Sequence, residues 1–147
     1  MSISFTDQEL KRAWRQLKKT SMPHTDGERE NAHRLLLFYA VECGLKAVWL
    51  KRRNQTLFTE EDVKQTGHDL AKILTRLRAG HHVRLPDNIQ LAPVRGGSGN
   101  SNEQQRNCSL ESLHQVWRYG GASQTPTDKQ CEEQLEQVVN WISGELQ

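Results

Sequence analysis

The sequence has few cysteines and no long hydrophobic run, and both absences exclude classes of protein. Its 147 residues include three cysteines, an odd number without C-x-x-C spacing, so neither a secreted disulfide framework nor a structural metal site is expected. The longest apolar run, residues 35–41, is far shorter than the roughly 18 residues that span a membrane. The first ten residues carry Asp7 and Glu9 and no apolar stretch, so no signal peptide is expected. We therefore predict a cytoplasmic protein without membrane contact or a bound metal.

Glycine motifs that hold phosphates or present a nucleophile are also missing. The chain contains no G-x-x-x-x-G-K-[ST], G-x-G-x-x-G or G-x-S-x-G sequence, the signatures of phosphate loops, dinucleotide sites and nucleophile elbows. Three glycines fall close together in residues 95–102, but the composition there is typical of a polar loop. No cofactor is predicted.

Charge is distributed unevenly along the chain. Residues 1–80 hold 15 Lys and Arg against 10 Asp and Glu, whereas residues 81–147 hold 5 against 8. The basic first half could face a polyanion or an acidic partner. Alternatively, both halves simply present solvated faces.

Apolar residues recur at helical spacing through most of the chain. The capping box of Thr6 and Glu9 predicts a first helix that ends before Ser21, and Thr127 with Gln130 forms a second possible box. Gly80 is a stop signal. The predicted helices start at Thr6, at Thr25 or Asp26, at Thr59, at residues 67–69, at Ser109 and at Thr127.

The second helix is apolar on nearly every side in its middle, over residues 32–50. A helix of this kind is usually central to a bundle or lies in a subunit interface. We therefore predict that residues 32–50 form a homodimer contact or dock a partner subunit.

Residues 81–108 contain apolar side chains without a sustained period, and Pro86 and Pro93 interrupt them. No strand-like alternation competes with the helical pattern elsewhere. We therefore predict an all-α fold: a single domain, residues 1–147, with a bundle of four to five helices and a long loop around residues 81–108.

Two stretches carry a family resemblance. The first is AVECGLKAVWL at residues 40–50, followed by Gly67-His68-Asp69-Leu70, and the second is Trp117-Arg118-Tyr119-Gly120 before a polar loop and a final helix. Together they resemble the HEPN domain, a small helical-bundle family named for its nucleotide-binding members, over roughly residues 30–146. The residues at the family's motif positions are Glu42, Lys46, His68, Asp69, Arg118 and Tyr119.

One departure from the family bears on catalysis. HEPN ribonucleases place an arginine, four to six residues and a histidine near the start of the late helix, but no histidine follows Arg118 here. Arg76 and His81 have the spacing at another position, and His82 also fits. A histidine can move a proton near neutral pH and an arginine can hold a phosphate, so this pair could be catalytic. It could instead bind phosphate, or be a solvated helix end.

Basic residues supply the candidate nucleic-acid site, because clustered cations bind phosphate without sequence preference. Trp14 and Trp49 could stack on bases, although core packing is the alternative. Glu42 and Lys46 could form a surface ion pair or, as the resemblance implies, face an interior groove. His68 and Asp69 could cap a helix or join a polar site. Arg118 with Tyr119 could anchor the last loop or contact a ligand. The basic candidates are Lys11, Arg12, Arg15, Lys18, Lys19, Arg52 and Arg53.

These observations predict a non-catalytic binding or assembly module that contacts RNA or a partner protein. The resemblance implies a bacterial context such as a toxin–antitoxin pair, an antiviral defence system or a mobile element. One alternative is a metal-independent ribonuclease that uses Arg76 and His81, and another is a purely structural subunit of a larger complex.

Overall fold

The computed structural model describes residues 3–24, 27–67, 69–95 and 103–147, and the fold there is mixed α/β. The prediction of an all-α bundle is therefore wrong. In chain order the elements are β1 (Phe5–Thr6), α1 (Asp7–Thr20), α2 (Asn31–Arg52), β2 (Leu57–Phe58), α3 (Glu60–Thr66), α4 (Leu70–Arg76), β3 (Asn88–Arg95), β4 (Glu103–Ser109), a 3-10 turn (Leu110–Ser112), α5 (Leu113–Arg118), β5 (Ser123–Thr125) and α6 (Asp128–Glu145).

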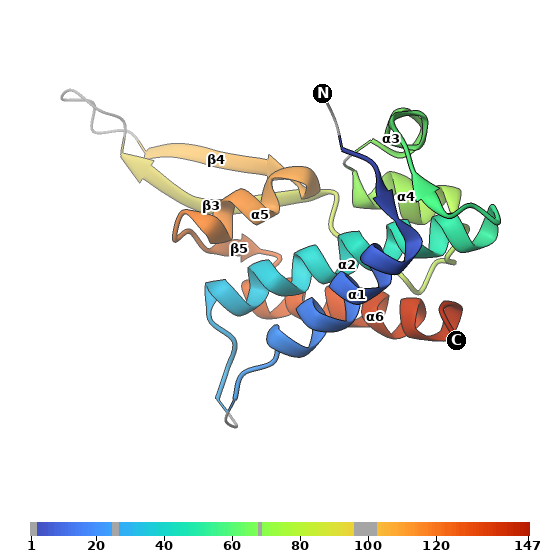
Figure 1. Cartoon of the computed structure of the whole chain (residues 1–147). Coiled ribbons are helices and arrows are strands. Elements are labelled where there is room, and N and C mark those ends of the chain that lie inside the picture. The colour runs from blue at the N-terminus through green and yellow to red at the C-terminus, as the bar shows by residue number, and fades with distance from the viewer. Residues whose placement is uncertain (1–2, 25–26, 68, 96–102) are drawn as a thin grey trace.

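The longest helix, α2, runs through the middle of the molecule, with α1 and α6 packed along it and α4 and α5 beside it (Figure 1). Ten of its 22 residues are buried, which explains the apolar pattern on nearly every side of this helix. Its neighbours contribute narrower stripes, such as Leu10 and Trp14 from α1 and Leu135, Val138 and Ile142 from α6. The core is therefore organised around α2.

The helix starts largely follow the capping signals in the sequence. The Thr6 backbone N–H donates to Glu9 Oε1 at 2.9 Å and the Glu9 N–H donates to Thr6 Oγ1 at 3.1 Å, so the predicted capping box is confirmed. Thr127 caps α6 as predicted. The start of α2 differs, because Glu30 is its N-cap. The predicted caps Thr25 and Asp26 lie outside the described residues.

The structure contains two antiparallel sheets, in place of the predicted loop and all-helical architecture. β1 pairs with β2, and β3 lies between β4 and β5 in a three-stranded sheet. The β3–β4 hairpin projects away from the helices (Figure 1). Its strands occupy residues 88–95 and 103–109, so the predicted long loop at 81–108 is wrong. Pro93 sits where the β3–β4 register shifts, a position at which a missing backbone donor is tolerated.

A close helix crossing fixes the positions of α1, α2 and α6. Gly44 of α2 has no side chain, and a Cβ atom built there would lie 2.7 Å from Trp14 Cε3 and 2.9 Å from Ile142 Cγ2. Glycine therefore lets both neighbouring side chains reach the α2 backbone. Among the described helices, none is both long and apolar enough to cross a membrane.

Candidate functional site

The α1 basic face consists of the five predicted cations on this helix. Lys11 lies 3.9 Å from Asp7, and the Lys18 ammonium lies 5.0 Å from the centre of the Trp14 ring. Arg12, Arg15 and Lys19 are exposed. These three form no ion pair within 4 Å with any acid in the described part of the chain. The members of the face are Lys11, Arg12, Arg15, Lys18 and Lys19.

The other two predicted cations, at the end of α2, have intramolecular partners. Arg52 lies 3.3 Å from Glu145, donates to the Leu77 carbonyl and lies over the Trp141 ring. Arg53 lies over the Trp49 ring, with its guanidinium carbon 4.5 Å from the ring centre. These contacts connect the end of α2 to α6 and α4, so Arg52 and Arg53 contribute less free positive charge than the sequence suggests.

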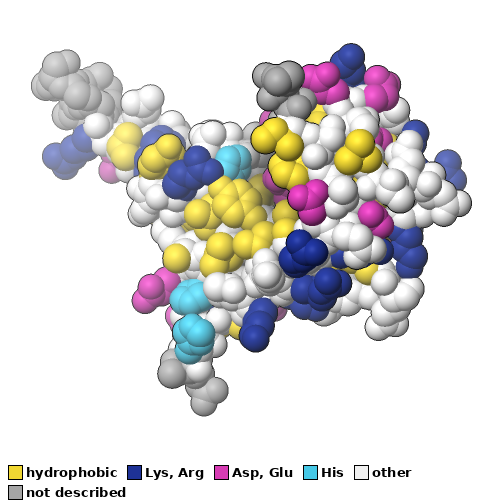
Figure 2. Space-filling view, viewed as in Figure 1, with side chains coloured by type: hydrophobic (Ala, Val, Ile, Leu, Met, Phe, Trp, Pro, Cys, Tyr) yellow, Lys and Arg dark blue, Asp and Glu magenta, His cyan; other side chains and the backbone are white. Residues whose placement is uncertain are grey.

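The predicted partner surface, residues 32–50, lies largely inside the monomer, because most of residues 37–50 are buried against other elements of the same chain. One side of α2 stays partly open. It lies between α1 and α5, where Figure 2 shows a hydrophobic area bordered by Lys and Arg side chains over α1. We call this surface the α2 strip. Its members are Ala32, Leu35, Leu36, Tyr39, Glu42, Cys43 and Lys46.

Within the α2 strip, Lys46 Nζ lies 3.5 Å from Glu42 Oε1. They form a local helical ion pair, and Lys46 Nζ also lies 5.4 Å from the centre of the Phe58 ring. The predicted stacking residues Trp14 and Trp49 are both buried, each with 4% of its surface exposed. Core packing is therefore the correct alternative for both tryptophans.

Arg118 and Tyr119, from the second family stretch, have different environments. Arg118 Nη2 donates to Tyr39 Oη at 2.5 Å, which ties the end of α5 to the α2 strip. Tyr119 is 78% exposed, so its ring stays open to solvent. The structure thus places one free aromatic ring next to a cation at the edge of the strip, a feature that we did not predict.

Asp69, another residue at the family's motif positions, has a structural role. The Asp69 carboxylate accepts hydrogen bonds from the Ala71 and Lys72 backbone N–H groups, at 3.0 and 3.4 Å, and caps α4. This confirms the capping interpretation for Asp69. His68 lies outside the described residues.

A cleft of about 610 Å³ lies where α4 ends and the chain turns toward β3; we call it the α4 cleft. Its polar lining includes Arg78, His81, Arg84 and Asp87, and its apolar lining includes Leu74 and Val83. Arg84 Nη2 lies 3.2 Å from His81 Nδ1. Of the predicted pair, His81 lines the cleft and Arg76 is not among its lining residues.

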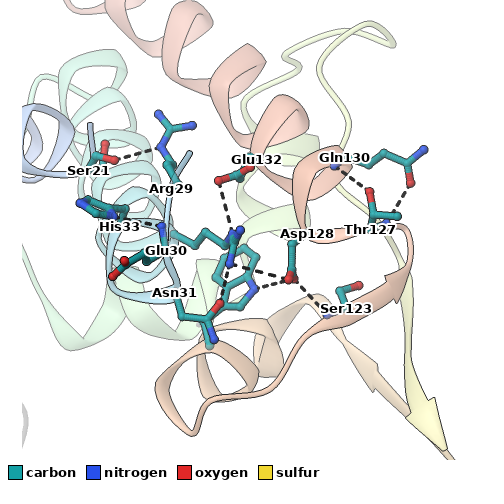
Figure 3. A network of polar contacts seen from close by, with 12 residues as sticks. Ser21, Arg29, Glu30, Asn31, His33, Ser123, Thr127, Asp128, Gln130 and Glu132 are labelled. Atoms are coloured by element: carbon teal, nitrogen blue, oxygen red, sulfur yellow. Dashed lines mark hydrogen bonds and ion pairs between the residues drawn. The ribbon is translucent and has the colours of Figure 1, made fainter. Parts of the chain in front are cut away.

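A polar network joins the start of α2 to the start of α6 (Figure 3). The Asp128 carboxylate accepts from Trp117 Nε1 and from the Ser123 backbone N–H, both at 2.9 Å. Arg34 lies 3.7 Å from Asp128 and 3.3 Å from Glu132. Burial raises the pKa of Glu132 above its ordinary value, although Arg34 opposes this shift. Because its members are paired with one another, we assign this network to folding and not to ligand binding.

Within the described ranges, no group of three or more His, Cys, Asp or Glu side chains is placed to hold a metal ion. Comparison with known proteins adds no constraint, since no family model, curated protein or solved structure matches this chain. Any function must therefore be argued from the surfaces themselves.

Proposed function

We propose that this chain is a non-catalytic RNA-binding module that holds single-stranded RNA across the α1 basic face and the adjoining α2 strip. The observation that carries the proposal is that Arg12, Arg15 and Lys19 are exposed on one helix and form no ion pair within 4 Å among the described residues. Unpaired cations at helical spacing attract phosphates and release counterions when they bind.

The apolar strip beside the cations supports single-stranded over double-stranded RNA. Proteins that bind single-stranded nucleic acids combine a positively charged groove for the backbone with open surfaces on which unstacked bases lie. Tyr39 and Tyr119 supply the aromatic rings on this side of the molecule, and Arg118 supplies a further cation between them. This combination favours RNA binding without strong sequence preference.

The position of Arg76 outside the lining of the α4 cleft supports a non-catalytic role. A general acid or base and its phosphate-holding cation must converge on one phosphodiester, and only the histidine of this pair lines the α4 cleft. The alternative of a metal-independent ribonuclease is tested by incubating labelled RNA with wild type and His81→Ala in EDTA. Cleavage by the wild type that the variant lacks would overturn the non-catalytic assignment.

The binding proposal is tested by fluorescence anisotropy with a labelled oligouridylate. The test variant is the triple substitution Arg12→Ala, Arg15→Ala and Lys19→Ala. We expect it to weaken binding by at least tenfold. Its control removes three exposed lysines elsewhere on the surface, at the positions Lys64, Lys72 and Lys129.

Both triple variants lower the net charge by the same amount, so their comparison separates a local site from general attraction. Equal weakening by the two variants would contradict the proposal. Absence of RNA binding by the wild type would instead favour the purely structural subunit.

A protein partner is the second candidate, because Leu35, Leu36 and Tyr39 leave apolar surface open on the α2 strip. A second copy of the chain would cover this surface in a homodimer. Sedimentation of wild type and Leu35→Glu tests it: a dimer that the substitution dissociates supports the candidate, and a monomer at all concentrations contradicts it. The HEPN resemblance, a cytoplasmic location and a toxin–antitoxin, defence or mobile-element setting remain part of this proposal.

A further inference from the structure

The α4 cleft is built by a segment whose side chains alternate between core and solvent. Leu77, Ala79, Val83 and Leu85 are buried and hold the segment against the helices. Arg78, His81 and Arg84 lie between these anchors and are exposed. Because the anchors are buried, they fix the backbone so that the two arginines and the histidine line one cavity.

The groups in this cleft are mainly hydrogen-bond donors. Arg84 Nη2 lies 3.2 Å from His81 Nδ1. When the neutral imidazole accepts this bond at Nδ1, its Nε2 carries the hydrogen and remains a donor. Neither Arg78 nor Arg84 lies within 4 Å of a carboxylate in the described ranges. Asp87 also lines the cleft, so the two guanidinium groups still outnumber the acids there.

Arg78 lies in the turn that ends α4. Its φ of +53° is in the left-handed region, and the Ala79 backbone N–H donates to the Leu74 carbonyl at 3.3 Å. Helices commonly end with one residue in this conformation. The turn places Arg78 among the residues that line the cleft.

We propose that the α4 cleft is a second anion site, which binds a phosphate ester through Arg78, His81 and Arg84. The cleft volume of about 610 Å³ falls within the range for small-molecule sites and exceeds what one phosphate group fills. Its apolar wall of Ala71, Leu74 and Val83 suits an organic group attached to the phosphate. The ester can be a free small molecule or the terminal phosphate of a nucleic acid, and this site is independent of the α1 basic face.

The first test is titration calorimetry with phenyl phosphate, inorganic phosphate and benzyl alcohol. We expect phenyl phosphate to bind more tightly than inorganic phosphate, since the apolar wall contacts the ring, and benzyl alcohol not to bind. Arg78→Gln and Arg84→Gln should each weaken phenyl phosphate by about tenfold, the loss expected for one charge-assisted hydrogen bond. Arg76→Gln is the matched control, because it removes the same charge from the end of α4 without touching the cleft lining.

Two results would overturn the proposal: no binding of phenyl phosphate by the wild type, or equal weakening by Arg76→Gln and Arg84→Gln. All three substitutions are at exposed positions, and circular dichroism would check that each variant is folded. A second arm compares oligoribonucleotides that differ only in a 5′-phosphate or 5′-hydroxyl end. Tighter binding of the phosphorylated end, abolished by Arg84→Gln, identifies a nucleic-acid terminus as the source. Equal binding of both ends, with phenyl phosphate still bound, identifies a free small molecule.

Discussion

Substituting Gly44 with alanine tests the close crossing of α1, α2 and α6. The added Cβ would lie 2.7 Å from Trp14 Cε3 and 2.9 and 3.0 Å from two carbons of Ile142, closer than real Cβ contacts. Both neighbouring residues are buried, so they cannot move aside freely. Overpacking of this kind costs about 1–3 kcal/mol, whereas replacing glycine within a helix by alanine gains up to about 1 kcal/mol. We expect Gly44→Ala to lower the free energy of unfolding by up to about 2 kcal/mol.

Gly144→Ala is the control for this experiment. Gly144 also lies in a helix, α6, but a Cβ atom there would meet nothing within 4 Å. Only the helix-propensity gain applies, so this variant should be slightly more stable than the wild type. The difference between the two variants in urea unfolding isolates the packing cost, at about 1–3 kcal/mol. Equal changes in both variants would refute the crossing geometry.

Two further predictions concern ionisable groups whose pKa values are shifted in the folded protein. Burial alone would raise the pKa of Asp62, but hydrogen bonds from Thr59 and from Trp49 outweigh it and hold this pKa below its ordinary value. The charged carboxylate therefore stabilises the fold above about pH 4 and loses this effect as the pH falls. Asp62→Asn should lower the free energy of unfolding by about 1–3 kcal/mol at pH 7. In urea titrations, the difference in unfolding free energy between this variant and the wild type should shrink below pH 4. A difference that stays constant with pH would contradict this explanation. Burial raises the pKa of Cys43 and of Cys131 to about 11. Iodoacetamide should therefore modify both thiols slowly at pH 7.5 until urea unfolds the chain. Fast labelling of the native protein would show instead that these thiols are accessible.

The sequence predicted the helices well because their signals are local. The capping boxes at Thr6 and Thr127 need only residues three positions apart. The central position of α2 was equally accessible, since a helix that is apolar on nearly every side must be surrounded. Whether other elements of the chain or a second subunit surround it depends on the tertiary structure, and here most of the cover is intramolecular.

The β3–β4 hairpin could not be predicted by the same means. Most side chains of β4 are exposed and polar, so this strand lacks the alternation of a half-buried strand. In β3, buried Ile89 and half-buried Leu91 flank exposed Gln90, but this alternation is short and ends at the bulge near Pro93. Ile89, Gln90 and Leu91 were the available signal, and they were too few to outweigh a loop.

The candidate site was predictable in composition but not in detail. Spacing alone could not show that Arg52 pairs with Glu145 near the other end of the chain. The Arg-to-His spacing indicates Arg76 and His81 but not Arg78 and Arg84, which line the cleft with His81. The buried anchors Leu77, Ala79, Val83 and Leu85 are the pattern that could have indicated which side chains project together.

The salt dependence of RNA binding is the most direct test of the central claim. For single-stranded RNA, the logarithm of the association constant falls with the logarithm of salt concentration by about 0.7 for each phosphate neutralised. We expect the triple substitution of Arg12, Arg15 and Lys19 to reduce this slope by about 2. The control triple of Lys64, Lys72 and Lys129 should leave the slope unchanged. An unchanged slope in the first variant would contradict the assignment of RNA binding to α1.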